Sequence, residues 1–359
     1  MRRLKVGLIG AGTIANSAHL PAIAHLHEEL ELVAVADIRP EMAEKAAKEY
    51  GAEAWYDDYR QLLARPDIDF VDICTPEFLH HEQVIAAADA GKHIHCEKPM
   101  SATVAEADEM IAAARRNNVK LMIGHSRRFT PRYQKIRAAI ERGEIGEVKL
   151  VRENERRAAS MYDALNVWAG YWTPEGSKPW VASAQFTQGA ALTNAVHETD
   201  LARWFAGQDG ASVYAEARIT NPEGEVPDMI TYTITFKNGA VGAAEVVNQL
   251  PTGYPYFHMM EVFGSQGTIR ATDPPMSPYE IWTTQGMRFP TNFALLIHVD
   301  IAYVRELQQF AASVRDDTPV PLDPWEARQA IALSVAAVES SRTNKIVTLP
   351  SASRPGGAA

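Results

Sequence analysis

The sequence predicts a two-domain α/β chain, in which a doubly wound parallel sheet is followed by an α+β domain with a largely antiparallel open sheet. Three observations predict this fold. The 359 residues exceed the size at which one hydrophobic core usually keeps growing. Up to Gly124, short apolar runs alternate with longer amphipathic ones, as parallel strands and crossover helices do. After His125, apolar and polar residues alternate in the manner of antiparallel strands.

The first domain is predicted over residues 1–124. Helices are expected at residues 42–50, 82–90 and 104–116, where alanine and charged residues recur at helical spacing. The strands are expected in the segments LKVGLIG, ELVAVAD, DFVDIC, KHIHC and VKLMIG.

The second domain is predicted over residues 125–350, with helices at 131–142, 190–205, 299–315 and 325–342 and a flexible tail at 351–359. A loop at residues 160–188 carries four aromatic side chains. They favour an ordered wall near a pocket and plain surface packing about equally: Trp168, Tyr171, Trp172 and Trp180. The strands are expected in EVKLVRENE, SVYAEARI, MITYTITF, AVGAAEVVNQ, MMEVFG, GTIRAT and YEIWTT.

Composition limits the function classes. A formal net charge of -10 opposes attraction to nucleic acid, and no apolar run reaches the roughly 20 residues that a membrane span needs. The short glycine-broken run after Arg2 and Arg3 is better interpreted as a strand than as a signal peptide, so we expect a cytoplasmic protein. Cys74 and Cys96 each end an apolar run and are expected to be buried, reduced thiols.

The first strand leads into Gly10-Ala11-Gly12-Thr13-Ile14-Ala15, a G-x-G-x-x-A turn that opens a helix. Such a turn lets the backbone approach a pyrophosphate at the helix N-terminus. Asp37 ends the next strand at the spacing expected for a ribose-binding carboxylate, which predicts a Rossmann dinucleotide site. Asp37 would repel a 2'-phosphate and favours NAD, whereas Arg39 could neutralise that phosphate and leaves NADP open.

Four further motifs occur in order along the chain: TPEFLH at residues 75–80, AGKHIHCEKPMS at 90–101, GHSRRFTP at 124–131 and GAALTNAVHETDLARWFAG at 189–207. With these motifs the chain resembles the glucose-fructose oxidoreductase, inositol dehydrogenase and rhizopine-catabolism (Gfo/Idh/MocA) family over nearly its whole length.

The resemblance implies that Lys98, in the Glu97-Lys98-Pro99 turn, reaches the nicotinamide and the substrate hydroxyl, and that His197 exchanges the proton. It also implies a cis bond before Pro99. The residues expected to bind the cofactor are Gly10, Gly12, Thr13, Ile14, Asp37, Arg39, Thr75, Pro76, His80, Glu97 and Lys98. The residues expected near the substrate are Arg127, Thr193, Asn194 and Trp180; for Arg127 and Arg128 a surface salt bridge is an equal alternative.

Two positions depart from the family pattern. Many sugar and cyclitol dehydrogenases of the family carry an aspartate four residues before the histidine, where this chain has Thr193. The arginine that the family places after the loop tryptophan is absent at Trp180-Val181. Both differences put the substrate in doubt more than the reaction class.

No metal site is expected. His93 and His95 have the H-x-H spacing of some zinc sites, but the strand that carries them is interpreted as simply buried.

The resulting hypothesis is an NAD(P)-dependent dehydrogenase that oxidises a secondary hydroxyl of a sugar, cyclitol or related polyol. Two alternatives stay open: a glycosidase that retains NAD and acts by transient oxidation and elimination, and a non-catalytic dinucleotide-binding regulator. Retention of Lys98 and His197 argues against the regulator. The resemblance further implies a homodimer or homotetramer, with a small-molecule substrate and neither nucleic acid nor membrane as partner.

Overall fold

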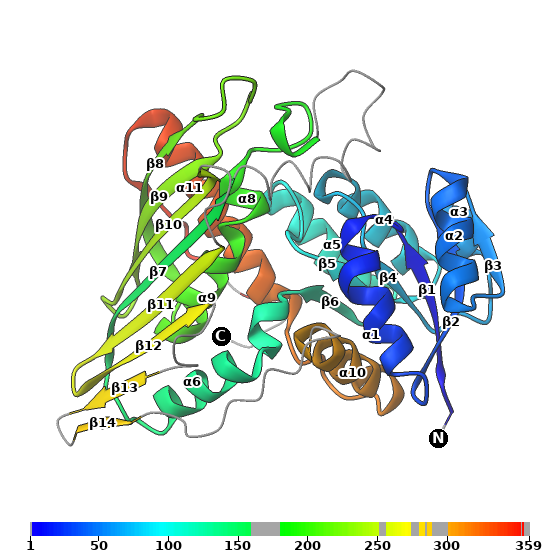
Figure 1. Ribbon diagram of the computed structural model, residues 1–359, viewed down its shortest axis with the longest axis horizontal. Coiled ribbons are helices and arrows are strands. Elements are labelled where there is room, and N and C mark those ends of the chain that lie inside the picture. The colour runs from blue at the N-terminus through cyan, green and yellow to red at the C-terminus, as the bar shows by residue number, and fades with distance from the viewer. Residues whose placement is uncertain are drawn as a thin grey trace. The chain divides into compact units, whose positions relative to one another are not determined.

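The computed structural model describes residues 2–158, 180–250, 256–273, 280–283, 286–288, 301–352 and 354. The chain forms two compact units (Figure 1). Unit 1 comprises Met1–Thr130 and Leu296–Arg328, and unit 2 comprises Pro131–Leu295 and Gln329–Ala359. Each unit is built around its own sheet.

Unit 1 contains a six-stranded sheet in the order β3-β2-β1-β4-β5-β6, and every neighbouring pair is parallel. Its strands are β1 (Leu4–Ile9), β2 (Leu30–Ala36), β3 (Ala54–Tyr56), β4 (Phe70–Ile73), β5 (His93–Glu97) and β6 (Leu121–Gly124). The helices are η1 (Ala15–His19), α1 (Leu20–His25), α2 (Pro40–Tyr50), α3 (Tyr59–Leu63), α4 (Glu77–Asp89), α5 (Val104–Arg116), η2 (Ser126–Phe129) and α10 (Ile301–Arg315). The predicted doubly wound parallel sheet is confirmed.

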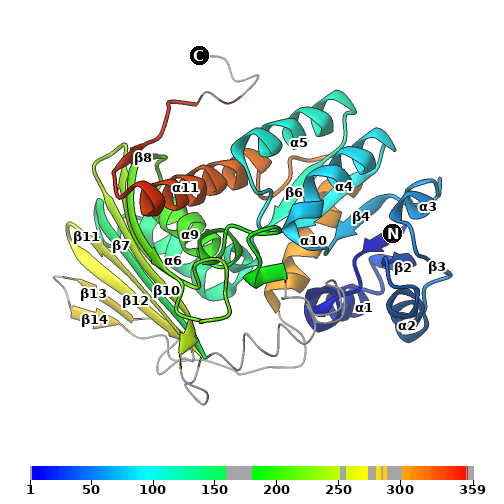
Figure 2. The ribbon, with the colours of Figure 1, turned by 90° about the horizontal axis from the view of Figure 1, so that it is seen from above.

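Helices cover both faces of this sheet: α4 and α5 pack side by side over one face, and α1 and α10 over the other (Figure 2). The central strands are buried on both faces, since all four residues of β4 and all four of β6 are buried. This accounts for their mainly apolar sequence, in which Asp72 of β4 is the exception. The short β3 and α3 were not expected from the sequence, because Ala54–Tyr56 is only a three-residue strand at the sheet edge.

Helix α10 packs in the core of unit 1, although the sequence-based division assigned all of residues 125–350 to the second domain. Its buried side chains Val304, Leu307 and Phe310 belong to the same apolar cluster as Val6 and Leu8 of β1. The ring of Phe310 lies edge-on to Phe70 of β4, with centroids 5.3 Å apart. The amphipathic pattern predicts that this helix packs against a core, but it does not identify which one.

Unit 2 contains a nine-stranded sheet in the order β14-β13-β12-β11-β7-β10-β9-β8-β15. Only β7 and β10 pair in parallel; the other neighbours are antiparallel, as predicted. The strands are β7 (Val148–Ala158), β8 (Gly210–Arg218), β9 (Met229–Phe236), β10 (Val241–Leu250), β11 (Phe257–Gly264), β12 (Gly267–Asp273), β13 (Glu280–Thr283), β14 (Gly286–Arg288) and β15 (Val347–Thr348). The helices are α6 (Pro131–Glu141), η3 (Trp180–Ala182), α8 (Ala190–Thr193), α9 (Val196–Ala206) and α11 (Pro324–Thr343), whose first turn belongs to unit 1.

One face of this sheet carries the unit's core. In β9, buried Ile230, Tyr232, Ile234 and Phe236 alternate with exposed threonines. This is the alternation that the sequence predicted. Helices α6, α9 and α11 lie over that face (Figure 2).

The described residues include no helix that is both long enough and apolar enough to cross a membrane. Cys74 and Cys96 are free and buried, which confirms the prediction of reduced core thiols.

We predict that Phe310→Ala destabilises unit 1 by about 3–5 kcal/mol, because a fully buried aromatic ring is removed and the cavity collapses only partly. Urea unfolding followed by circular dichroism measures the change. Gln309→Ala, on the exposed side of the same helix, is the matched control and should change stability little. Equal stabilities of the two variants would show that α10 is not part of this core.

Candidate active site

The parallel sheet of unit 1 brings the predicted site residues to one edge. Asp37 follows β2, Gly10 follows β1, Thr75 follows β4, Lys98 follows β5 and His125 follows β6. In parallel strands all carboxyl ends lie at the same edge of the sheet. Between β1 and β4 the chain order reverses, and such a switch point is where open α/β sheets bind ligands.

Gly10 and Gly12 shape the first turn differently. Gly10 has a φ of +93°, and a Cβ there would lie 2.9 Å from the backbone of Cys74 and Thr75, so only glycine is tolerated. At Gly12 no described atom lies within 4 Å of the place where a Cβ would stand. The Asn16 side chain donates to the carbonyls of Ala11 and Gly12, at 2.7 and 2.8 Å, and holds the turn. This open, backbone-lined turn fits a pyrophosphate, with Thr13 and Ile14 half-buried beside it.

Asp37 is tied to the glycine turn. Its Oδ2 accepts the N–H of Ala11 at 2.8 Å, and its Oδ1 accepts the N–H of Arg39 at 2.9 Å. Burial raises the pKa of Asp37, although these two N–H donors oppose the shift. The carboxylate retains further lone pairs that a ribose diol could use. The Arg39 Nε lies 3.7 Å from Oδ1, so the two predicted selectivity residues form a pair.

His80 joins two of the turns. Its Nδ1 lies 2.8 Å from the Pro99 carbonyl and its Nε2 lies 2.8 Å from the Thr75 carbonyl. Burial lowers the pKa of His80, and a neutral ring donates to one carbonyl at a time. Since backbone takes both ring nitrogens, His80 would act by fixing the Thr75-Pro76 and Lys98-Pro99 turns. Its direct contact with a cofactor stays a prediction.

Lys98 is half-buried at the end of β5, and the peptide bond between Lys98 and Pro99 is cis, as the resemblance implied. The backbone N–H of Lys98 donates to Glu97 Oε2 at 3.1 Å. Glu97 itself is only 3% exposed. The turn therefore places a lysine beside a buried carboxylate at the carboxyl edge of the sheet.

Behind Glu97, a chain of imidazoles and carboxylates runs through the interior of unit 1. Glu97 Oε1 lies 3.0 Å from His19 Nε2, and His19 Nδ1 lies 2.8 Å from Asp72 Oδ2. Asp72 Oδ1 lies 2.8 Å from His95 Nδ1, and His95 Nε2 lies 3.9 Å from Glu306 Oε1. We call these five residues the buried relay. None of its side chains is more than 4% exposed.

The charges of the buried relay support one another. Burial alone would lower the pKa of His19 and of His95, but Asp72 outweighs it, and the pKa of His95 rises to about 9. Burial would raise the pKa of Asp72, yet the two imidazoles bring it below its ordinary value. Burial also opposes ionisation of Glu97, and the hydrogen bond from His19 lowers its pKa on balance. Burial raises the pKa of Glu306.

Arg127 and Arg128, the predicted residues after β6, lie in η2. Arg128 is buried, and its Nη1 lies 3.6 Å from Glu326 Oε2, which favours the salt-bridge interpretation for this residue. Arg127 is half-buried, and its role at a substrate stays a prediction.

In unit 2, the predicted helix 190–205 is broken into α8 and α9. The N–H of Ala195 donates to the carbonyl of Ala190 at 2.8 Å, one residue further back than in an α-helix. The Thr193 hydroxyl lies 3.0 Å from Asn194 Oδ1 and 3.3 Å from the Gly189 carbonyl. His197 follows in the first turn of α9 and is 8% exposed. Thus Thr193, Asn194 and His197 lie together around one helix break.

Trp180 begins η3 and is partly exposed. The other aromatic residues predicted to line a pocket, Trp168, Tyr171 and Trp172, lie outside the described residues.

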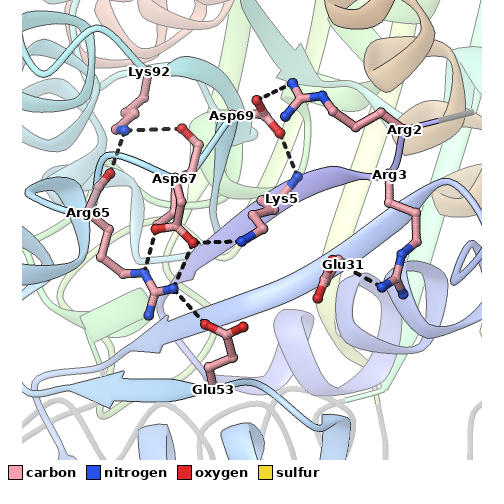
Figure 3. A network of polar contacts seen from close by, with 10 residues as sticks. Arg2, Arg3, Lys5, Glu31, Glu53, Arg65, Asp67, Asp69 and Lys92 are labelled. Carbon is pink, nitrogen blue, oxygen red and sulfur yellow. Dashed lines mark hydrogen bonds and ion pairs between the residues drawn. The ribbon is translucent and has the colours of Figure 1, made fainter.

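The amino edge of the same sheet carries charges that satisfy one another (Figure 3). Asp69 accepts from Arg2 and from the Lys5 N–H, while Asp67 pairs with Lys5 and Arg65. A pocket of about 440 Å³ opens there, lined in part by Arg2 and Lys92. The Lys92 ammonium donates hydrogen bonds to two backbone carbonyls. Both Lys92 and Arg2 therefore already have partners within the protein. The pocket lies at the opposite edge from the predicted site.

Sequence reasoning missed most of the buried relay. His19, Asp72 and Glu306 were not singled out, and His95 was weighed only with His93 as a zinc pair. The structure separates those histidines: His93 Nδ1 accepts the N–H of Lys120, whereas His95 bonds Asp72. A signal was present, because an ionisable residue inside an apolar strand, as in FVDI, must have a buried partner.

Comparison with known proteins agrees with this geometry. Residues 4–125 match a family model described as an oxidoreductase family with an NAD-binding Rossmann fold, and residues 133–270 match the Gfo/Idh/MocA C-terminal domain. The chain belongs to the Gfo/Idh/MocA oxidoreductase family. The glycine turn, Asp37 and the Lys98 turn are therefore parts of an NAD-binding Rossmann domain, and their arrangement fits that cofactor.

Relatives span nearly the whole chain. An uncharacterised oxidoreductase of Bacillus subtilis, YrbE, is 31% identical over 94% of each chain. The myo-inositol 2-dehydrogenase of Thermotoga maritima is 28% identical over 96% of this chain and 98% of the relative. Among solved structures, levoglucosan dehydrogenase in complex with NADH is 27% identical over 97% of this chain and all of that chain, with a TM-score of 0.85.

We predict that the unfolding free energy of unit 1 decreases between pH 6.5 and 9. His95 titrates near 6.5 when unfolded and at about 9 when folded, so its contribution is complete below pH 6.5 and lost as pH rises through the folded pKa. The loss amounts to roughly 3 kcal/mol at most, since each pKa unit corresponds to about 1.4 kcal/mol. Urea titrations across this window measure it. In His95→Gln the dependence should flatten, and an unchanged slope would contradict the charge assigned to His95.

Proposed function

We propose that this chain reversibly oxidises a secondary hydroxyl of a cyclitol, sugar or related polyol, with NAD as the hydride acceptor. The observation that carries the proposal is the position of Lys98. It follows β5 at the carboxyl edge of the sheet, at the same edge as the glycine turn after β1 and Asp37 after β2. A cation at that place can stabilise the alkoxide that develops during oxidation.

Bound NAD would supply the hydride acceptor, and the residues named above would hold it. Gly10 and Gly12 would admit the pyrophosphate, Asp37 the ribose diol, and the Thr75-Pro76 turn would flank it. Lys98 would donate a hydrogen bond to the oxygen of the reacting hydroxyl. His197 would accept the hydroxyl proton, a role that imidazole side chains commonly fill.

The relatives support the substrate class. Those compared include enzymes named myo-inositol 2-dehydrogenase, scyllo-inositol 2-dehydrogenase (NAD(+)) and levoglucosan dehydrogenase. A polyol or sugar is therefore the class to test first, with Arg127, Thr193, Asn194 and Trp180 as candidates for contacting it. A homodimer or homotetramer in the cytoplasm stays a prediction, and size-exclusion chromatography with light scattering tests the assembly.

The experiment is a spectrophotometric screen of NAD and NADP against myo-inositol, scyllo-inositol, levoglucosan and a panel of aldoses. Reduced cofactor should accumulate in proportion to substrate consumed. A glycosidase that retains NAD would release sugar without free NADH, and a regulator would bind NAD without turnover.

We predict that Asp37→Ser shifts cofactor preference towards NADP by about tenfold, because it relieves roughly 1.4 kcal/mol of repulsion with a 2'-phosphate while Arg39 remains. The measurement is the ratio of kcat/KM for NAD and NADP. Asp37→Asn is the isosteric companion variant, since it removes the charge and keeps one of the two oxygen acceptors that Ala11 N–H and Arg39 N–H use. An unchanged ratio in both variants would show that Asp37 does not face the ribose.

We predict that His197→Ala lowers kcat by about 10² to 10⁴, the usual contribution of a general acid or base, and leaves the Kd for NAD unchanged. Lys98→Ala should lower kcat comparably and also weaken substrate binding. Steady-state kinetics and a fluorescence titration with NADH separate the two effects. Turnover near the wild-type rate in His197→Ala would remove it from the mechanism.

A further inference from the structure

We propose that Glu306, His95, Asp72 and His19 act as positioning residues for Lys98: they keep Glu97 ionised, and Glu97 in turn holds the Lys98 ammonium charged and in place. The proposal rests on the proposed function of Lys98. It assigns a role to four residues that come from four different elements and have no part in the proposed reaction itself.

The first step is the continuity of the buried relay. Three consecutive contacts of 2.8, 2.8 and 3.0 Å connect His95 to Asp72, Asp72 to His19 and His19 to Glu97. Glu97 Oε2, the oxygen not bonded to His19, accepts the Lys98 N–H at 3.1 Å. The two oxygens of Glu97 therefore link the interior chain to the turn that carries Lys98.

The second step is charge. A carboxylate as buried as Glu97 would take up a proton unless a cation and hydrogen bonds compensated it. His19 provides both, and it stays protonated because Asp72 lies on its other nitrogen. His95 contributes more weakly and from a distance, and Lys98 itself also favours the ionised form of Glu97.

The third step is reciprocity. If the Lys98 charge lowers the pKa of Glu97, then ionised Glu97 raises the pKa of Lys98 by the same coupling energy. A protonated Glu97 would lose that coupling. The protonation state of His19 therefore affects the pKa of Lys98 through Glu97, and no direct contact between the two side chains is required.

Other groups face the relay and do not replace its cations. Tyr303 of α10 lies edge-on to His19, with ring centroids 5.0 Å apart, and burial keeps its hydroxyl protonated by raising its pKa. Ser126 hydrogen-bonds that hydroxyl. Burial raises the pKa of Cys74 to about 12 and that of Cys96 as well, so both thiols are neutral.

On the α4 side, His80 faces Glu97 and Lys98, and burial lowers its pKa. Around His95, the carboxylates Asp72 and Glu306 face the ring, and the second imidazole of the relay, His19, lies 5.8 Å away between ring centroids. Phe310 packs at 5.7 Å between ring centroids. Glu306 Oε1 and Oε2 are buried and accept no hydrogen bond from a described residue. Its carboxylate thus faces the cationic His95 as the outer end of the relay.

The ligand atoms of His19, Asp72 and His95 lie close enough to suggest a metal site. Their contacts indicate hydrogen bonds instead. Each imidazole directs its Nδ1 to a different oxygen of Asp72 at 2.8 Å, the length of a charge-assisted hydrogen bond. A metal would require the three donors to converge on one point at about 2.0–2.2 Å.

The test is the pH profile of kcat/KM for NAD-dependent oxidation of myo-inositol, or of the fastest polyol in the panel. Lys98 should set the alkaline limb. In His19→Gln, Glu97 loses its cation and takes up a proton, so the pKa of Lys98 falls and the limb moves to lower pH by about one unit. His95→Gln should move it in the same direction by about half as much, since His95 acts on Glu97 only through space.

Glu29→Gln is the matched control. Glu29 precedes β2 and accepts hydrogen bonds from Gln308 and Arg315 of α10, the helix that carries Glu306. This variant therefore neutralises a carboxylate that contacts the same helix without touching the relay. Its limb should stay in place. A purely structural relay would lower stability and the fraction of active enzyme but leave the limb unmoved, and that result would overturn the proposal.

A measurement on the unsubstituted protein tests the proposal even when a variant does not fold or no compound in the panel is a substrate. In ¹⁵N-histidine NMR, two of the 11 histidines should remain imidazolium from pH 5 to 8. Two neutral relay histidines at pH 7, or a stoichiometric metal by mass spectrometry, would overturn the proposal. Full activity in Lys98→Ala would instead refute the proposed function, whatever the histidine signals show.

Discussion

Parallel pairing of six strands is the constraint on which the candidate site depends. Because every strand of unit 1 runs in the same direction, the turns after β1, β2, β4 and β5 meet at one edge without any special feature of the turns themselves. The turns then differ only in chemistry. Gly10 gives close backbone approach, Asp37 an acceptor and Lys98 a cation. At the opposite edge the same geometry collects charges too, but Asp67 and Asp69 pair there with neighbouring cations (Figure 3).

Burial of charge is the second constraint, and it follows from the first. A parallel sheet with helices on both faces leaves no water beside Asp72, so its carboxylate must be compensated from within the protein. His19 and His95 do this by each bonding a different oxygen of the carboxylate. The arrangement costs desolvation of several groups, and replacing it by apolar side chains could be equally stable. Stability alone therefore does not explain why charge is kept in this core, whereas a role at Glu97 does.

The sequence was most informative where local pattern determines structure. Short, mainly apolar segments predicted β1, β4 and β6, and alternation of apolar and polar residues predicted β9. Burial on two faces of a sheet or on one determines these patterns directly. The G-x-G-x-x-A turn is also a local pattern, and it predicted a dinucleotide site at the carboxyl edge of the sheet. Long-range partners leave no such record: His19 is 53 residues from Asp72 and 78 from Glu97. The periodicity of α10 likewise shows that one face of the helix is buried, but it does not show which of the two cores that face contacts.

The helix break in unit 2 shows how a departure from a family pattern can be accommodated locally. Asn194 Oδ1 lies 3.0 Å from the Thr193 hydroxyl and 3.1 Å from Asn248 Nδ2, which donates to it. The Thr193 hydroxyl also lies near the Gly189 carbonyl, so position 193 is surrounded by acceptors. An aspartate there would set one acceptor against two others in a buried place, unless Asn194 turned its amide group. Threonine is thus matched to Asn194 and Asn248. The neutral group at position 193 is part of a cluster of three side chains: Thr193, Asn194 and Asn248. If Thr193 and Asn194 contact the substrate as proposed, this cluster is where a change from threonine to a carboxylate would alter substrate preference.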